Sequence, residues 1–386
     1  MEPKAGHLFF APHRAFIGTS LCLAAGAGTP LGLWMALVWA GWATTDRFSS
    51  LLAAHGQLQV YGFVCLYTMG VAMMVLPGTL KATLQPRWLA FASLVLMLTG
   101  IAANSASPNL LGAALESGSV IAYLFVLGRT RRSAKSTAST DTLSRQHAFF
   151  LATGSLWLLA CPWLALLDST RALETVLWGF AGLHIAGIGL RIHPSLLGIK
   201  GIQKQWLLPS AVCWNVGLLL FWLGPEGLWS WFLALGVGCF LWALRPFRRP
   251  RIGPGGGAWV RYYIQTSYLG LFLAVCFTCA TASGYPTLAG AARHLLATGF
   301  VIMMMVGMGL RMIPAYETRR LPWRSGPWAI YFILVLGTAV RVTTQAFYSF
   351  TWLAVGAVLQ TVAIVLFACL TLGMYAFGQT VVCEQG

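Results

Sequence analysis

Apolar residues in this chain gather into long runs that short polar segments separate. A run of about 20 apolar residues gives an α-helix long enough to cross the hydrocarbon core of a bilayer. The predicted fold class is therefore all-α, a polytopic membrane protein in which residues 1–386 form a single transmembrane domain. About twelve spans are expected, at 15–40, 56–78, 87–105, 108–128, 147–167, 172–195, 205–223, 227–244, 258–282, 288–314, 326–346 and 351–378.

One short pattern occurs three times in these runs: Gly-Phe, six residues, Gly, six residues, Pro. The copies begin at Gly62, Gly179 and Gly299, and a period of roughly 120 residues in a membrane chain indicates a repeated bundle of helices. The copies fall on the second, sixth and tenth spans. We therefore expect three pseudo-threefold-related units of four helices, at about 15–128, 147–244 and 258–378.

Composition identifies the solvent of this fold. Hydrophobic residues make up 58% of the chain and charged residues only 9%, whereas soluble domains carry about 25% charged residues. So little charge cannot cover a water-facing surface, so lipid must cover most of the molecule. The polar N-terminal segment shows no cleavable signal peptide.

The basic residues predict the orientation. Most of the 25 Lys and Arg lie in the terminal segments and in loops that follow even-numbered spans, and basic loops stay in the cytoplasm. We expect a multi-pass protein of the bacterial inner (cytoplasmic) membrane with both termini cytoplasmic. The net charge of +16 then reflects topology and anionic lipid head groups, and it requires no nucleic acid partner. The opposite side holds Arg47, Arg171, Arg293 and Arg341.

Two histidines occupy related places. His55 lies seven residues before its Gly-Phe pair and His294 lies five before its own, so both lie near the outer ends of repeated spans. Imidazoles that project from facing helices at similar depth are able to ligate one haem iron from both sides. The alternative is that each is an interfacial residue at a helix end. Ionisable residues at membrane depth are functional candidates by default.

Other polar residues are candidates for supporting roles. Arg341, at the outer end of its span, and Arg293, beside His294, are candidates to neutralise haem propionates. His184, inside the sixth span, is a candidate ligand of a second haem or another metal, or a hydrogen-bond donor between helices. Glu116 is a costly membrane carboxylate that would pair with an arginine, hydrogen-bond a histidine or carry a proton.

Copper is a second possible metal. Cys276 and Cys279 are spaced as a Cys-x-x-Cys pair in one span, and methionines cluster around Met303. Thiolates suit Cu(I), but most cysteines lie inside apolar spans, where a free thiol is usually a small packing residue. We therefore interpret both groups mainly as helix-packing residues.

Three phrases carry a family resemblance. They are Gly62-Phe-Val-Cys-Leu-Tyr-Thr-Met-Gly70, the segment Trp178 to Pro194 and the segment His294 to Pro314, with the opening Phe9-Phe-Ala-Pro-His13-Arg14-Ala-Phe16 as a fourth. Together they resemble the NnrS family. The resemblance implies a polytopic, haem- and copper-containing membrane protein linked to the nitric oxide response.

The predicted architecture also resembles the catalytic subunit of haem-copper oxidases and nitric oxide reductases, which has twelve helices in three arcs. That resemblance implies a low-spin haem held by helices two and ten, which corresponds to His55 and His294. The chain departs from it in three places. The tenth span has one histidine, the seventh span (205–223) has none for copper, and the sixth span lacks a His-Pro-Glu phrase at the expected depth.

Three hypotheses of function remain. The first is a haem b-binding protein of the NnrS type, involved in the nitric oxide response or electron transfer, without an oxygen-reducing binuclear centre. The second is a haem-bearing or structural subunit of a larger respiratory complex, with a redox partner subunit or cytochrome. The third is a membrane transporter, because repeats and intramembrane polar residues also suit transport. Catalytic residues stay unknown.

Overall fold

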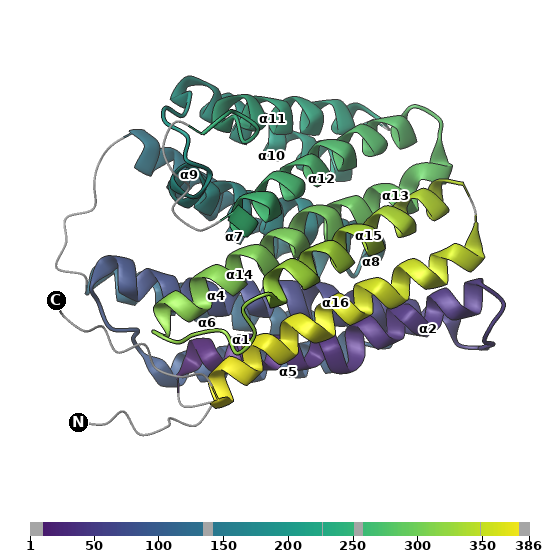
Figure 1. The fold of residues 1–386 in the computed structure, drawn as a ribbon, viewed down its shortest axis with the longest axis horizontal. Helices are drawn as coiled ribbons and strands as arrows, with labels where there is room; N and C mark the ends of the chain where they lie inside the picture. The colour runs from purple at the N-terminus through teal and green to yellow at the C-terminus, as the bar shows by residue number, and fades with distance from the viewer. Residues whose placement is uncertain (1–10, 134–141, 226, 251–257, 348, 378–386) are drawn as a thin grey trace.

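The chain folds as a bundle of long helices that lie side by side (Figure 1). The computed structural model describes residues 11–133, 142–225, 227–250, 258–347 and 349–377. Within these ranges the regular elements are all helices. Where elements follow one another without a break they form one continuous helix, and eleven such helices in the described ranges are long and apolar enough to span a membrane. The shorter apolar helix Leu228–Leu244 gives a twelfth span. The predicted fold class is thus confirmed, and the protein is a multi-pass membrane protein.

The first unit contains four spans, two of which change their helix type along their length. Its elements are α1 (Pro12–Leu23), η1 (Ala24–Gly28) and α2 (Thr29–Trp39) in the first span, α3 (Phe48–Gln57), η2 (Leu58–Cys65) and α4 (Leu66–Leu80) in the second, then α5 (Arg87–Asn104) and α6 (Leu110–Arg132). Both η1 and η2 are π-helical.

The second and third units repeat this order. The second has α7 (Thr142–Leu164), the second-span elements α8 (Ser169–Thr175), η3 (Val176–Gly182) and α9 (Leu183–Leu197), the short η4 (Lys204–Trp206), α10 (Leu207–Leu223) and α11 (Leu228–Leu244). The third has α12 (Ala258–Ala282), the second-span elements η5 (Pro286–Leu288), α13 (Ala289–His294), η6 (Leu295–Ile302) and α14 (Met303–Tyr316), then α15 (Gly326–Ala346) and α16 (Phe350–Phe377). These bounds lie within a few residues of most predicted spans, and the second span begins earlier than expected, at Phe48.

The Gly-Phe pair of each repeat copy lies in a π-helical segment of the second span. These segments are η2, η3 and η6, and each lies between two α-helical stretches. A π-helix bonds each N–H one residue further back than an α-helix does, and such segments are often found at functional sites. The recurrence supports the division into three units, which stays a prediction.

The second glycine of each copy lies at a close contact between two helices. A Cβ on Gly70 would lie 2.9 Å from Phe16 Cβ, one on Gly187 3.1 Å from Phe150 Cβ, and one on Gly307 2.4 Å from Tyr263 Cβ. These partners lie on the first helix of each unit. The glycine of each Gly-Phe pair contacts the same first helix, at a residue seven positions later in that helix. Gly179 therefore faces Trp157, and Gly299 faces Gly270.

The proline of each copy begins the same C-terminal turn. The carbonyls of Pro77, Pro194 and Pro314 accept bonds of 3.0, 2.9 and 3.0 Å from the N–H groups of Ala82, Ile199 and Arg319. The residue before each donor is left-handed, with φ of 49° at Lys81, 66° at Gly198 and 51° at Thr318. This is the Schellman pattern, which satisfies carbonyls that a helix end leaves unpaired.

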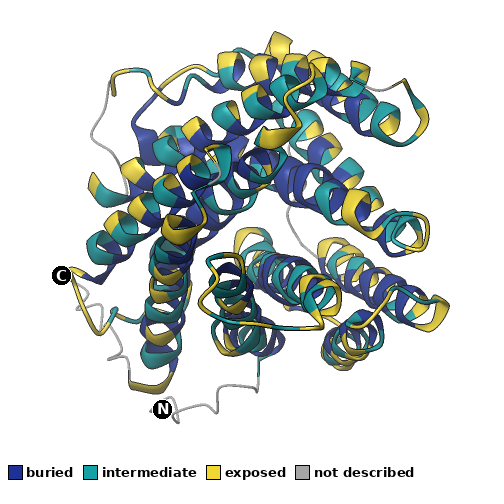
Figure 2. Cartoon of the chain, turned by 90° about the vertical axis from the view of Figure 1, so that its right-hand side faces the viewer, coloured by how far each residue is buried: buried dark blue, intermediate teal, exposed yellow. Residues whose placement is uncertain are grey.

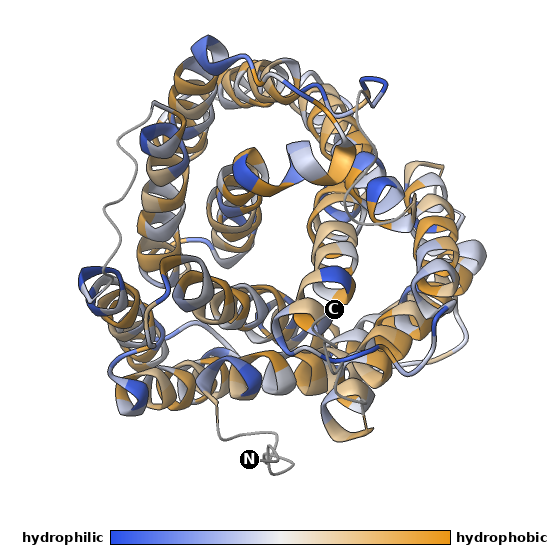
Figure 3. Cartoon of the chain, turned by 60° about the vertical axis from the view of Figure 1, so that its left-hand side comes forward, coloured by the Kyte–Doolittle hydropathy of each residue, from blue (hydrophilic) through white to orange (hydrophobic). Residues whose placement is uncertain are grey.

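Buried faces turn toward neighbouring helices and exposed faces turn outward (Figure 2). The outward faces include large apolar side chains such as Trp88, Leu167 and Leu223, and apolar residues extend along most of the helices (Figure 3). An apolar outer surface is stable in contact with lipid but not with water. The arrangement therefore agrees with the composition argument.

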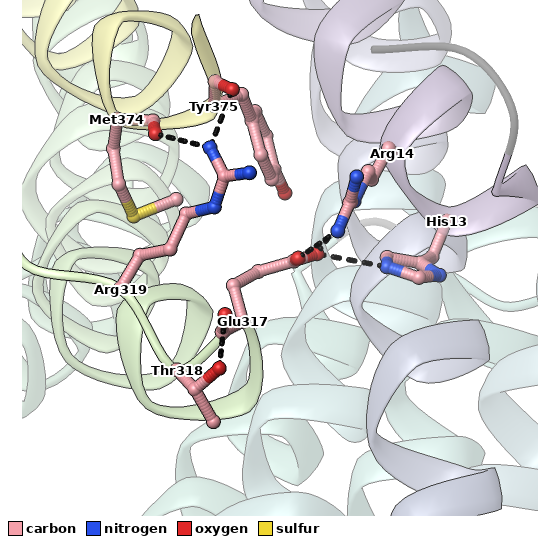
Figure 4. Close-up of polar contacts among 7 residues, drawn as sticks. All are labelled: His13, Arg14, Glu317, Thr318, Arg319, Met374 and Tyr375. Atoms are coloured by element: carbon pink, nitrogen blue, oxygen red, sulfur yellow. Dashed lines mark hydrogen bonds and ion pairs between the residues drawn. The ribbon is translucent and has the colours of Figure 1, made fainter. Parts of the chain in front are cut away.

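A polar cluster joins the first and third units at one end of the bundle (Figure 4). The Glu317 carboxylate, which follows α14, accepts hydrogen bonds from His13 (2.9 Å) and from both Nε (3.1 Å) and Nη2 of Arg14 on α1. Arg319 donates to the carbonyls of Met374 and Tyr375 near the end of α16. We call these six residues the end cluster.

Candidate functional site

His55 lies near the end of α3 and is held by the first span. Its Nδ1 donates a hydrogen bond of 2.8 Å to the carbonyl of Gly28, the last residue of η1. The ring also lies against Gly32 on α2, where an added Cβ would be 2.5 Å from His55 Cε1. Only glycine leaves room for the imidazole at this position.

His294 is the last residue of α13 and makes an equivalent bond within its own helix. Its Nδ1 donates to the carbonyl of Gly290, 2.9 Å away. A neutral imidazole that donates from Nδ1 carries its lone pair on Nε2. Both histidines therefore present a potential metal-binding nitrogen, and a backbone bond to the other ring nitrogen is typical of histidines that ligate metals.

His55, His294 and Arg341 line the same cavity, together with Gln59, Thr298 and Gln360. The cavity lies between the first two spans of the first unit and the last three spans of the third. Its volume is about 100 Å³, whereas pockets for cofactor-sized molecules measure about 300–1,000 Å³. A haem would therefore enter only if the surrounding side chains moved apart.

Two buried polar atoms at this cavity lack a hydrogen-bond partner. They are Nε of Arg341, a residue that is only 6% exposed, and Oε1 of Gln59. An unpaired buried polar group is costly, and more so for a charged side chain. The backbone of Arg341 is fixed by close packing against Gly356 on α16, where an added Cβ would lie 2.9 Å from Arg341 N. Among the described residues no ion pair joins Arg341 to a carboxylate, so the cavity offers an unpaired cation beside two imidazoles.

These residues fit an iron porphyrin in their chemistry. Imidazole nitrogens suit iron, and a buried guanidinium suits the carboxylates of the propionates. Among the described residues, no group of three His, Cys, Asp or Glu side chains is arranged to hold a metal ion. A pair of imidazoles suffices for a porphyrin iron, because the macrocycle supplies the other ligands.

Thr298 and Gln360 belong to the cavity wall but were not among the sequence candidates. The Gln360 amide donates to the hydroxyls of Thr298 and Thr338, at 3.2 and 3.4 Å. Both are polar residues within apolar spans, and Thr298 immediately precedes the repeated Gly299-Phe300 pair. That polarity was an available signal, but the rotation of each helix was not known from the sequence.

Arg293 and His184 lie elsewhere. Arg293 is exposed and donates through Nε (2.9 Å) and Nη2 (2.6 Å) to Glu174 on α8. His184 on α9 donates from Nδ1 to the carbonyl of Phe180 (3.0 Å), and its Nε2 lies 3.5 Å from the hydroxyl of Ser155. The structure therefore does not bring these two side chains together with His55 and His294, and a second metal at His184 stays a prediction.

Comparisons with known proteins address the fold. No family model and no curated protein sequence matches the chain. Among solved structures, the chain is similar to a haem-copper terminal oxidase that was determined as a dimer by cryo-EM. The TM-score is 0.62 at 14% sequence identity, and the match covers 96% of this chain and 85% of that one. At this identity the likeness establishes a shared fold, which is that of a haem-copper oxidase.

Proposed function

We propose that this chain holds one haem b between His55 and His294 and transfers electrons within the membrane. The supporting observation is that both rings donate from Nδ1 to backbone carbonyls, Gly28 and Gly290, and line one cavity. Nε2 is the free ligand atom on each side. When bound, such a haem supplies a one-electron redox couple.

Arg341 is proposed to bind the haem propionates, since its guanidinium is buried and its Nε has no partner. His55 and His294, near the C-terminal ends of α3 and α13, would hold the iron. Gly32 keeps the ring of His55 in place by leaving room for it. The chain's own groups thus orient the cofactor and compensate its charge.

The repeated phrases extend this proposal to a protein of the NnrS type, in which electron transfer serves the nitric oxide response. With both histidines as its ligands, a haem iron would have no open position, which favours electron transfer over binding of a gas. We also propose a redox partner subunit or cytochrome in the bacterial inner membrane. Both termini would be cytoplasmic, consistent with the contact between Arg14 and the Tyr375 ring, 5.8 Å from Arg14 Cζ to the ring centroid.

An absorption spectrum tests the proposal. The purified protein, oxidised and then reduced with dithionite, should show the sharp α-band of a low-spin haem b. His55→Ala and His294→Ala should each abolish it. His147→Ala is the matched control, because His147 also donates from Nδ1 to a backbone carbonyl, that of Gly187 (2.7 Å), but lies outside the cavity.

The outcomes separate the hypotheses. A protein that inserts in the membrane but has no haem band would favour the transporter or the structural subunit. A normal band in both cavity variants would refute the ligand assignment while leaving the haem in place.

A further inference from the structure

The histidine cavity has a counterpart between the first and second units. In the third unit, Gly337 on α15 packs against Gln360 on α16, and a Cβ on it would lie 3.0 Å from Gln360 N. In the first unit, Gly100 on α5 packs against Glu116 on α6 with the same distance of 3.0 Å to Glu116 N. Glu116 therefore occupies the place of Gln360.

Other residues that line the histidine cavity also have counterparts around Glu116. Counting from the repeated glycines Gly62 and Gly299, Gln57 takes the place of His294 and Tyr61 that of Thr298. Counting from Gly100 and Gly337, Asn104 takes the place of Arg341. We call Gln57, Tyr61, Asn104 and Glu116 the carboxyl chamber.

In the second unit, aromatic rings lie beside the corresponding glycine contact. Gly217 on α10 packs against Leu233 on α11, 2.8 Å from an added Cβ to the Leu233 nitrogen. The rings of Phe221 and Trp229 lie there with centroids 4.5 Å apart. Counted from Gly179, the residue that corresponds to His294 is Glu174, whose carboxylate is paired with Arg293. The neutral polar lining of the carboxyl chamber therefore does not follow from the repeat itself.

Glu116 is buried inside the carboxyl chamber. It is 1% exposed, and its Oε1 accepts a hydrogen bond from the Gln57 amide. The Asn104 side chain also lies close to the carboxyl. Within the part of the chain that the structure describes, Oε2 of Glu116 has no hydrogen-bond partner, and neither does the hydroxyl of Tyr61, which is also 1% exposed.

Groups that face the carboxyl from the surrounding elements are neutral. They are Gln57 on α3, Tyr61 and Cys65 on η2 and Asn104 on α5. Within the described ranges no ion pair or hydrogen bond joins Glu116 to an arginine, lysine or histidine. Three roles were expected for Glu116. The described structure contains neither the pairing with an arginine nor the hydrogen bond to a histidine, which leaves the binding of a proton.

We propose that Glu116 is a proton-binding site inside the membrane, held as the neutral carboxylic acid. An unpaired carboxylate at this depth is costly, whereas the acid needs only an acceptor for its proton. The two atoms without partners, Glu116 Oε2 and the Tyr61 hydroxyl, supply a donor and an acceptor directly or through a bound water. The ligand of this chamber is thus a proton that exchanges with solvent.

Infrared spectroscopy of the full-length protein in lipid tests this site. The parent protein should show a carboxylic C=O stretching band at neutral pH, which shifts to lower frequency after equilibration in D₂O. Glu116→Gln should lose the band and Glu116→Asp should keep one at a changed frequency. Glu174→Gln is the control, because Glu174 is paired with Arg293 and contributes a carboxylate band. The chain has only nine Asp and Glu, so the assignment is practicable.

Several results would overturn the proposal. They are a parent spectrum without the carboxylic band, a band that survives in Glu116→Gln, or a band that does not respond to prolonged D₂O exchange. None of these measurements requires haem. A protein that lacks haem but keeps the Glu116 band would refute the proposed function and support this site.

Discussion

The tautomer of each cavity histidine is decided by one backbone carbonyl. Gly28 accepts from His55 and Gly290 accepts from His294, and the two carbonyls come from different structural settings. Gly28 belongs to another span, so His55 depends on the packing of η1 against α3. Gly290 lies one turn before His294, so the second ring is held by its own helix. Substitutions that alter the packing of the first span should therefore disturb His55 more than His294.

Substitution of Gly32 should disturb His55 directly. In Gly32→Ala the new Cβ would lie 2.5 Å from His55 Cε1, so the ring must move, and we expect a weakened or absent haem α-band. Gly26→Ala is the control on the same span, because nothing lies within 4 Å of an added Cβ there. Equal spectra for the two variants would contradict the placement of His55.

Removal of the Arg341 charge should lower the haem midpoint potential. A nearby cation favours the reduced, less positive iron, with an interaction of roughly 4 kcal/mol at about 4 Å and an effective dielectric near 20, which solvent and counter-ions reduce to a fraction. Redox titration of Arg341→Gln against the parent measures the shift. Arg293→Gln should shift the potential less, because Arg293 is exposed and paired with Glu174. A raised or unchanged potential in Arg341→Gln would exclude the propionate contact.

At the scale of elements, the span positions followed from hydrophobicity, because lipid requires about 20 apolar residues per crossing. The π-helical segments could not be predicted from the sequence, because η2, η3 and η6 are as apolar as their surroundings and differ from them only in hydrogen-bond register. The candidate pair His55 and His294 followed from the repeat, which placed both on equivalent spans. Gly32, Thr298 and Gln360 were missed because their roles depend on helix rotation, which twelve apolar runs do not specify.

Close helix packing at the repeated glycines should be sensitive to a single methyl group. A Cβ on Gly270 of α12 would lie 2.4 Å from the Gly299 carbonyl oxygen, and backbone cannot yield as a side chain does. Overpacking of this kind costs about 1–3 kcal/mol. Thermal unfolding in detergent should show a lower midpoint for Gly270→Ala.

The matched variant is Gly238→Ala on α11, where an added Cβ meets nothing within 4 Å. Its midpoint should stay the same or rise, since alanine favours a helix over glycine. If both variants behaved alike, α12 and η6 would not be in contact as described.

At the scale of the whole molecule, the end cluster closes the ring of units by joining α1 to the segment after α14. Burial raises the pKa of Glu317, but hydrogen bonds from His13 and Arg14 lower it by more, so the pKa lies below its ordinary value of 4.5. A lowered pKa stabilises the folded protein above the unfolded value, and this contribution disappears as the pH falls through the folded value. Glu317 should therefore stabilise the protein fully at neutral pH.

Glu317→Gln tests this contribution. We expect it to cost about 1.5–3 kcal/mol, the range for hydrogen bonds to charged groups, measured as the loss of thermal stability at pH 7. The difference from the parent should shrink as the pH is lowered below about 4.5, where the parent carboxylate is itself protonated. A difference that stays constant with pH would show that the charge of Glu317 is not what joins the units.

The three π-helical segments also carry information about ancestry. A π-helical turn forms when one residue is inserted into an α-helix without disturbing the hydrogen bonds on either side. η2, η3 and η6 each enclose the Gly-Phe pair of their repeat copy. The same departure from α-helical register at the same place in all three copies is what duplication of one four-helix unit would produce. By contrast, α7 and α12 are α-helical throughout the part that the structure describes, so the Gly28 carbonyl that holds His55 belongs to a π-helical segment that the first spans of the other two units do not repeat there.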